Sequence, residues 1–336
     1  MLYIWLINCI FRAFIGLNQG ENHLSRDFKA YVYNWRRFGE GIEVPKINVL
    51  DLQKMKKDKN KISWLTCYDY SFASALNASD LDLILVGDSG GMVNLGYKNT
   101  NPVTMDEMIT LTSAVRRGAP DKFVIGDMPK GSYEVSTEKA IENAMRFAKE
   151  SDCDAVKLEG GLNMVNQVKA ISQSGIPVFG HIGLTPQSSN SFGGYRIVGR
   201  TKNEQEKLID DAKALEQAGV VAILIEATPD GIGSEIAKSL DVPIYGIGAG
   251  AEVDGQLLIF HDLLGIYPTF RPKFAPCLVN KVLPEFLESI SEIEDMKEFG
   301  RTTKQDGFWE ITRLVANEFT RMVKTGKYPD SDHVYN

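Results

Sequence analysis

The chain has 336 residues, of which 43% are hydrophobic and 24% are charged, and this composition is typical of globular proteins. Its length favours one large domain with extensions over several small domains. The net charge of −7 argues against a nucleic-acid-binding protein, which usually carries a basic face. The four cysteines form no CxxC pair, which argues against a disulfide framework and a zinc site.

Residues 1–43 form an N-terminal extension that begins with the apolar stretch "MLYIWLINCIFRAFIGL". This stretch is short for a membrane-spanning helix and is interrupted by Asn8 and Arg12. It lacks the basic start and the small-residue cleavage site of a secretory signal. Two interpretations stay open. The extension is a leader outside the fold of a cytoplasmic protein, or it is a targeting or membrane-surface segment, which would make a mitochondrial location the alternative.

Residues 44–330 are expected to form a single domain in which short apolar runs alternate with segments of helical periodicity. Strands are predicted at 62–69, 81–88, 122–128, 154–160, 176–183, 221–227, 242–250 and 257–266, and intervening helices at 104–120, 136–151 and 203–219. Because the runs are continuously apolar, they indicate strands buried on both faces of a parallel sheet. Eight strand–helix units predict an α/β fold, the (β/α)8 or TIM barrel.

Two further features complete the predicted architecture. An open doubly wound sheet is the alternative to a barrel, but no GxGxxG follows the first strand, which disfavours a dinucleotide-binding domain. Residues 273–300 and 307–326 are amphipathic and lack intervening strands. They are expected to be extra C-terminal helices that cover the barrel or mediate an oligomer.

Polar side chains stand at the ends of five predicted strands: Asp88, Asp127, Glu159, His181 and Glu226. The carboxyl ends of barrel strands meet at one mouth, where barrel enzymes carry their active sites. Several carboxylates in one mouth repel each other unless a cation or protonation relieves them. A hard divalent cation with oxygen ligands, usually magnesium, is the simplest solution.

Each of these residues also has a structural interpretation. Asp88 and the adjacent Ser89 are favoured helix caps. Lys157 and Glu159 lie two positions apart and so point to the same side of a strand, where they would line the mouth or form a structural ion pair. His181 is equally consistent with a hydrogen-bonded core histidine. The long polar segment 181–200 is typical of a lid or a binding loop.

Several motifs in this order resemble the ketopantoate hydroxymethyltransferase family: "YDYSFA", "LVGDSGGMV", "NPVTMDEM", "GDMP", "VKLEGG", "GHIGLTPQS", "FGGYRIVGR" and "DGQLLIFHDLLGI". The resemblance covers about residues 47–266. It implies a TIM barrel of the phosphoenolpyruvate/pyruvate-binding type. It also implies transfer of a hydroxymethyl group from 5,10-methylenetetrahydrofolate to 3-methyl-2-oxobutanoate, giving ketopantoate in the first step of pantothenate biosynthesis. The implied enzyme is a large homo-oligomer, a decamer, with a small-molecule substrate and no nucleic-acid or membrane partner.

The resemblance also assigns roles to residues. Asp88 and Asp127 match magnesium-binding aspartates that also contact the substrate, and Glu159 matches the third acidic residue of the metal site. Ser89 and Lys157 match residues that hold the carboxylate of the keto acid. Glu226 matches the proton acceptor, and His181 matches a pocket histidine whose role stays open.

Departures from the family pattern and two rival functions accompany these assignments. Among the departures, Gly90 stands where a larger aliphatic residue is common in the family. One rival is another 2-oxo-acid lyase or mutase of the same superfamily, which the absence of a lyase-type cysteine motif near "VKLEGG" disfavours. The other is a catalytically silent barrel kept as a binding or oligomerisation module, which the intact acidic residues disfavour.

Overall fold

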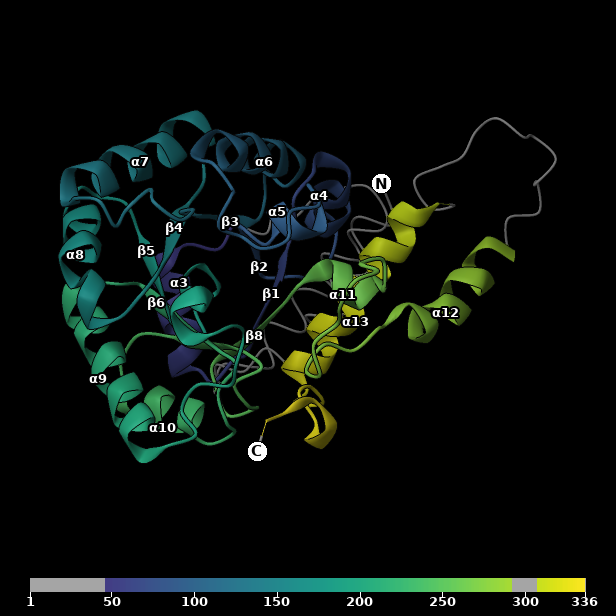
Figure 1. The fold of residues 1–336 in the computed structure, drawn as a ribbon. Coiled ribbons are helices and arrows are strands. Elements are labelled where there is room, and N and C mark those ends of the chain that lie inside the picture. Colours follow the sequence, from purple (N-terminus) through teal and green to yellow (C-terminus); the bar gives the residue numbers. More distant parts are fainter. Residues whose placement is uncertain (1–45, 292–306, 336) are drawn as a thin grey trace, which may run out of the picture. The chain divides into compact units, whose positions relative to one another are not determined.

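The computed structural model describes residues 46–291 and 307–335 (Figure 1). The predicted N-terminal extension, residues 1–43, lies outside the described residues. Eight parallel strands close into a barrel in the order of the sequence. The strands are β1 (Ile62–Thr66), β2 (Leu83–Val86), β3 (Phe123–Asp127), β4 (Ala155–Glu159), β5 (Val178–Gly183), β6 (Ala222–Glu226), β7 (Ile244–Ile247) and β8 (Gly255–Leu258). The predicted (β/α)8 barrel is therefore confirmed, and the open sheet is not.

Helices surround the barrel, with α6 to α10 following one another around its outside (Figure 1). Their bounds are α3 (Val49–Lys57), α4 (Tyr70–Asn77), α5 (Gly90–Val93), α6 (Met105–Gly118), α7 (Thr137–Glu150), α8 (Val165–Gln173), α9 (Lys202–Ala218), α10 (Ile232–Ser239), α11 (Phe260–Leu264), α12 (Val279–Ser291) and α13 (Phe308–Lys324). Short 3₁₀ helices span Leu162–Met164, Pro186–Phe192 and Ser331–His333. Every helix in the described ranges is too short or too polar to cross a lipid bilayer.

Local sequence signals explain where the longer helices begin. The side chains of Thr104 and Thr201 cap α6 and α9, and the side chains of Glu107 and Glu204 accept a hydrogen bond from the backbone N–H of the capping residue. This reciprocal arrangement satisfies two N–H groups that have no partner within the helix. Helix α9 ends at Gly219, whose φ of +97° is in the left-handed region that favours glycine.

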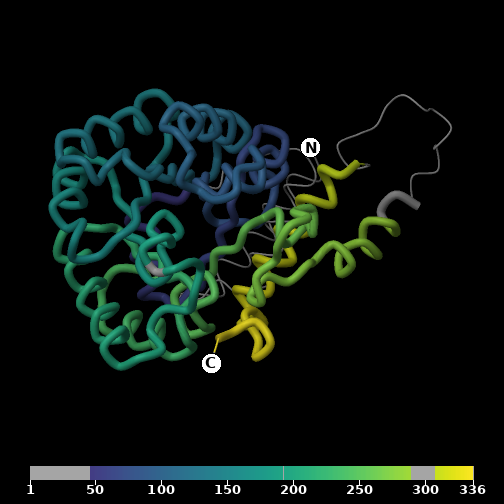
Figure 2. The backbone as a smooth tube through the Cα atoms, viewed as in Figure 1, coloured from purple at the N-terminus to yellow at the C-terminus, as the bar shows by residue number. Residues whose placement is uncertain are grey.

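The C-terminal helices pack on the side of the barrel where its first and last strands meet. Helix α13 contacts β1 and α4, and α12 packs on α13. Figure 2 traces the chain beyond α13, which turns back toward the barrel. The predicted role of these helices in covering the barrel is thus confirmed for α13.

An aromatic layer fills the interior of the barrel. It consists of Trp64, Phe123, Phe179 and Tyr245, which come from β1, β3, β5 and β7 and are at most 2% exposed. The ring centroids of Trp64 and Tyr245 are 5.3 Å apart, and those of Trp64 and Phe179 are 5.8 Å apart. Four side chains from alternate strands are the usual way in which such a barrel is packed.

The predicted strand at 257–266 is wrong in its second half. The strand spans Gly255–Leu258, and Phe260–Leu264 form helix α11, which begins where the Phe260 N–H donates to Thr66 Oγ1 at 3.1 Å. An apolar run does not by itself distinguish a short buried helix from a buried strand. In addition, residues 248–254 join β7 to β8 without a helix.

The long segment 181–200 also differs in part from its prediction as a loop. Its first residues extend β5 to Gly183, and Pro186–Phe192 form a 3₁₀ helix. This short helix lies at the mouth of the barrel, where Pro186 forms part of the lining of a cavity. The segment therefore brings its side chains to the ends of the strands.

Candidate active site

A cavity of about 670 Å³ lies at the carboxyl ends of the strands. Its lining includes Asp88, Ser89, Asp127, Lys157, Glu159, His181 and Glu226. All seven residues selected from the sequence therefore meet in one place. They converge because parallel strands of a closed barrel end at the same rim.

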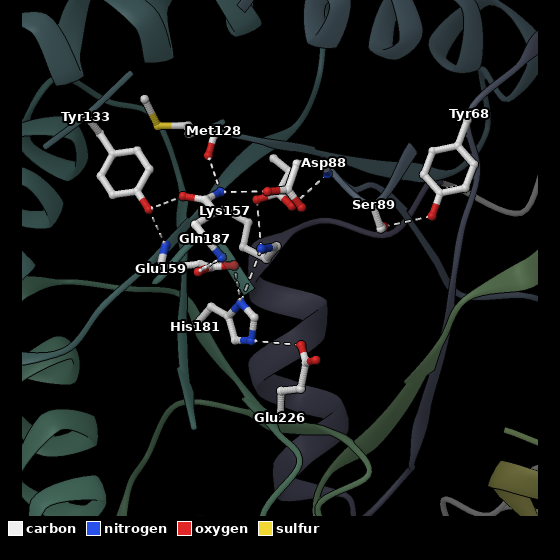
Figure 3. A network of polar contacts seen from close by, with 11 residues as sticks. Tyr68, Asp88, Ser89, Met128, Tyr133, Lys157, Glu159, His181, Gln187 and Glu226 are labelled. Carbon is white, nitrogen blue, oxygen red and sulfur yellow. Dashed lines mark hydrogen bonds and ion pairs between the residues drawn. The ribbon is translucent and has the colours of Figure 1, made fainter. Parts of the chain in front are cut away.

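On one side of the cavity, acidic groups surround a buried lysine (Figure 3). Lys157 Nζ lies 2.7 Å from Asp127 Oδ1, and both side chains are at most 3% exposed. The backbone N–H of Asp88 donates to Asp127 Oδ2 at 3.1 Å. This contact joins the end of β2 to the end of β3.

Burial and mutual repulsion shape the charges on this side. Burial raises the pKa of Asp88 well above its usual value, and the charges of Asp127 and Glu159 raise it further. Burial also raises the pKa of Glu159 to about 8. Burial opposes the charge of Lys157, but the neighbouring carboxylates outweigh it and the pKa of the lysine is raised. The lysine therefore stays charged, and either protonation or a further cation would relieve the repulsion among the acids.

On the other side of the cavity, His181 separates this cluster from Glu226. His181 Nδ1 lies 3.3 Å from Lys157 Nζ and 3.5 Å from Glu159 Oε1, and Nε2 lies 3.2 Å from Glu226 Oε2. Burial lowers the pKa of His181, and the charge of Lys157 lowers it further. The imidazole is therefore neutral at pH 7 and connects the two sides without adding charge.

The side chain of Glu226 is more accessible than those of His181 and Glu159. It is 17% exposed, against 2% for His181 and 3% for Glu159. Burial raises the pKa of Glu226, while its contact with His181 opposes the rise. A carboxylate with a raised pKa that still faces a cavity is suited to accept a proton.

Ser89 and the family departure at Gly90 are explained together. Ser89 Oγ lies 2.9 Å from the hydroxyl of Tyr68, a side chain that is 1% exposed. A Cβ atom added at Gly90 would lie 2.7 Å from Cδ1 of Tyr68. The glycine therefore gives the tyrosine ring the space from which it contacts Ser89.

Gln187, Tyr133 and Tyr335 are among the residues of this site that sequence reasoning missed. Gln187 and Tyr133 are 2% and 1% exposed and form hydrogen bonds among the acidic groups (Figure 3). Tyr335 lines the cavity, and its carbonyl oxygen accepts a hydrogen bond of 2.8 Å from the N–H of Asp230. Only the position of Gln187 in the long segment 181–200 signalled a role; neither tyrosine stands at a strand end.

The residues present fit a magnesium ion in part. In the ranges 46–291 and 307–335, no three His, Cys, Asp or Glu side chains form a ready-made metal cluster. Glu159 Oε2 accepts the N–H of Gln187 at 3.1 Å, so it is turned toward that segment. Asp88 and Asp127, which are hydrogen-bonded to each other, supply two hard oxygen donors. Magnesium is usually bound by one or two carboxylates together with water and substrate, and this pair suits it.

Comparisons with known proteins agree with this geometry. The profile of the family described as ketopantoate hydroxymethyltransferase matches residues 46–295. The protein named 3-methyl-2-oxobutanoate hydroxymethyltransferase from Alkaliphilus metalliredigens is 45% identical over 291 residues, which cover 87% of this chain and 93% of the relative. The protein of the same name from Desulfotalea psychrophila is 50% identical over 226 residues, or 67% of this chain and 81% of the relative.

Solved structures of other families share the fold. Phosphonopyruvate hydrolase in complex with oxalate and Mg²⁺ matches with a TM-score of 0.52 and 13% identity, covering 84% of this chain and 100% of that one. Oxaloacetate acetylhydrolase in complex with 3,3-difluorooxalacetate matches with a TM-score of 0.50 and 10% identity, covering 84% and 98%. The profile and the relatives go further than these fold matches, and by them the chain belongs to the ketopantoate hydroxymethyltransferase family.

Proposed function

We propose that this protein transfers a hydroxymethyl group from 5,10-methylenetetrahydrofolate to 3-methyl-2-oxobutanoate, giving ketopantoate, the first step of pantothenate biosynthesis. Membership of the family supports this activity. The observation that carries the proposal is the division of the cavity by His181. Lys157 and the acids lie on one side of this neutral imidazole, and Glu226 lies on the other.

In this proposal Asp88 and Asp127 hold magnesium, and Glu159 is the third acidic residue of the metal site. When bound, magnesium would supply Lewis-acid polarisation of the keto group. Ser89 and Lys157 hold the carboxylate of the keto acid. The lysine is suited to this role because it is buried beside Asp127 and keeps its charge.

Glu226 then removes the proton from C3 of the keto acid. The electrons of the broken C–H bond form an enolate, and the positive charge of Lys157 favours the developing oxyanion. C3 attacks the one-carbon unit of the folate, and water supplies the hydroxyl oxygen of the product as tetrahydrofolate leaves. The raised pKa of Glu226 makes its carboxylate a stronger base than an exposed one.

The proton-removal step is testable without the folate. The wild-type protein with magnesium should exchange the C3 proton of 3-methyl-2-oxobutanoate with deuterated water, which NMR follows directly. Glu226→Gln keeps the shape but cannot accept a proton. Because a general base contributes about 10²–10⁴-fold, exchange should fall by that factor while the keto acid still binds.

A matched control and two contrary outcomes sharpen this test. Glu206→Gln alters an exposed acid on α9, 61% exposed, and should leave exchange at the wild-type rate. Exchange at the wild-type rate in Glu226→Gln would remove Glu226 as the base and make His181 the next candidate. Loss of keto-acid binding together with exchange would make Glu226 a structural residue.

The other 2-oxo-acid chemistries of this fold are distinguished by the co-substrate. A lyase or mutase would turn over 2-oxo acids without a folate, and a catalytically silent barrel would turn over nothing. We expect product formation only when 5,10-methylenetetrahydrofolate is present. The assay is a turnover measurement with and without the folate.

Three wider proposals follow from the family. We assign residues 1–43 to an extension and 44–330 to one catalytic domain.

We place the protein in the cytoplasm, since the relatives described above are bacterial and the mitochondrial alternative depends on residues outside the described ranges. We propose a homo-oligomer larger than a dimer, a decamer by family resemblance. Light scattering that returned the mass of a monomer would refute this assembly.

A further inference from the structure

Gln187 occupies the centre of the polar network at the mouth of the barrel (Figure 3). It lies in the 3₁₀ helix Pro186–Phe192, and it is 2% exposed. Its side-chain Nε2 donates to Asp88 Oδ2 at 2.9 Å and to the backbone oxygen of Met128 at 3.0 Å. Both amide protons of the side chain are therefore engaged.

Tyr133 determines which way the Gln187 amide faces. The Tyr133 hydroxyl donates to Gln187 Oε1 at 2.6 Å and accepts the backbone N–H of Glu159 at 3.2 Å. A reversed amide would turn its oxygen toward the Met128 carbonyl and the Asp88 carboxylate, two acceptors, and its NH₂ group toward Tyr133. The reversed orientation is therefore disfavoured, and Nε2 must point at Asp88.

This orientation has a consequence for both acids that Gln187 touches. The side chain engages Oδ2 of Asp88 and leaves Oδ1 as the oxygen for an ion. The backbone N–H of Gln187 donates to Glu159 Oε2 at 3.1 Å. One residue of the segment 181–200 thus sets the orientation of two carboxylates that come from β4 and from the end of β2.

We propose that Gln187, oriented by Tyr133, is a positioning residue that holds Asp88 in the rotamer needed to bind a divalent cation. The inference rests on the proposed function, because Asp88 is a ligand only within that proposal. Groups that hydrogen-bond a ligating carboxylate typically contribute about 10–100-fold to metal affinity. The same contacts tie the segment 181–200 to the acidic side of the cavity, so the cation site and this segment are built together.

The test measures binding of magnesium alone to the full-length protein by titration calorimetry. Gln187→Met keeps the unbranched shape but removes both donors, and we expect its Kd for magnesium to rise about 10–100-fold. Tyr133→Phe removes the hydroxyl that orients the amide, and its Kd should rise by a smaller factor. If the two residues act as one unit, the double variant should bind no more weakly than Gln187→Met.

Gln256→Met is the matched control. Gln256 is a buried glutamine of β8, 1% exposed, whose Nε2 donates to the carbonyl of Gly250 at 2.9 Å, away from the acids. Its variant should lower the melting temperature as Gln187→Met does but keep the wild-type Kd. This pair separates positioning of the cation site from a general loss of stability.

Two results would overturn the inference. A wild-type Kd in Gln187→Met would show that Gln187 does not position the cation, and additive effects of the two substitutions would show that Tyr133 does not act through Gln187. In either case the wild-type protein still binds magnesium, and the proposed function stands. A wild-type protein that bound no magnesium would instead refute the metal site itself, and the inference with it.

Discussion

The mouth of this barrel and its floor, by which we mean the aromatic layer, are built on the same strands. Their side chains are of opposite kinds: charged and polar at the mouth, apolar rings in the floor. On β5, Phe179 lies in the aromatic layer and His181, two residues later on the same face, lies in the cavity. On β3, Phe123 lies in the same layer and Asp127, four residues later on the same face, lies in the cavity. The floor is stabilised by packing of rings, whereas the mouth holds acids whose pKa values burial and repulsion displace.

The floor of the barrel contributes mainly to stability, and the mouth contributes mainly to the chemistry. Burial of apolar rings stabilises the folded protein. Buried carboxylates cost free energy unless they are paired, and they are retained where a ligand repays that cost. Substitutions in the mouth should therefore change activity more than stability, and substitutions in the floor should do the reverse.

The largest expected effect is on activity, from Asp127→Asn in the mouth. The change removes one carboxylate charge beside Lys157 without changing shape. Because metal polarisation contributes several kcal/mol, magnesium-dependent C3 exchange should fall on the order of 10³-fold. The fold should persist, because the substitution keeps the shape of the side chain and leaves the aromatic layer of the barrel unchanged.

Exchange kinetics with and without magnesium, alongside thermal melting, measure both quantities. Near-normal exchange without added metal would show that Asp127 does not act through a cation. A large fall in melting temperature together with the loss of activity would show that the mouth contributes to stability as much as the floor does. It would contradict the division of roles between the two regions.

The next effect is on stability, from Phe179→Ala in the floor. Phe179 packs against Trp64, Phe123 and Tyr245. Removing a buried ring typically lowers the free energy of unfolding by about 3–5 kcal/mol. Urea titration measures this loss, and exchange per folded molecule should stay within a few-fold of wild type. A stable protein without activity would mean that the ring serves the chemistry instead.

The smallest effect is expected outside both regions. Deleting residues 1–43 should change neither melting temperature nor turnover measurably, because the family profile begins at residue 46. Thermal melting and the folate-dependent assay on the shortened chain, compared with the full chain, are sufficient. A large loss of either would extend the catalytic domain into the N-terminal extension and would contradict the proposed boundary.

The barrel and the set of acids at its mouth could be predicted from the amino-acid sequence. Continuous apolar runs specify strands buried on both faces, and a polar residue closing such a run must lie at the rim of the sheet. Asp127, Glu159, His181 and Glu226 could therefore be selected from single strands. The local pattern failed at Phe260–Leu264, where an apolar run folds as a helix whose first N–H donates to the side chain of Thr66.

The hydrogen bonds that hold those acids could not be predicted, because they join residues far apart in the sequence. Gln187 reaches Asp88 across 99 residues of sequence, and Tyr133 reaches Gln187 across 54. A Cβ atom at Gly90, on a different element, would come too close to the ring of Tyr68. Periodicity records which face a residue occupies, but it carries no information on which distant side chain completes a hydrogen bond there. That pairing depends on closure of the barrel, which brings the ends of β2, β4 and β5 together.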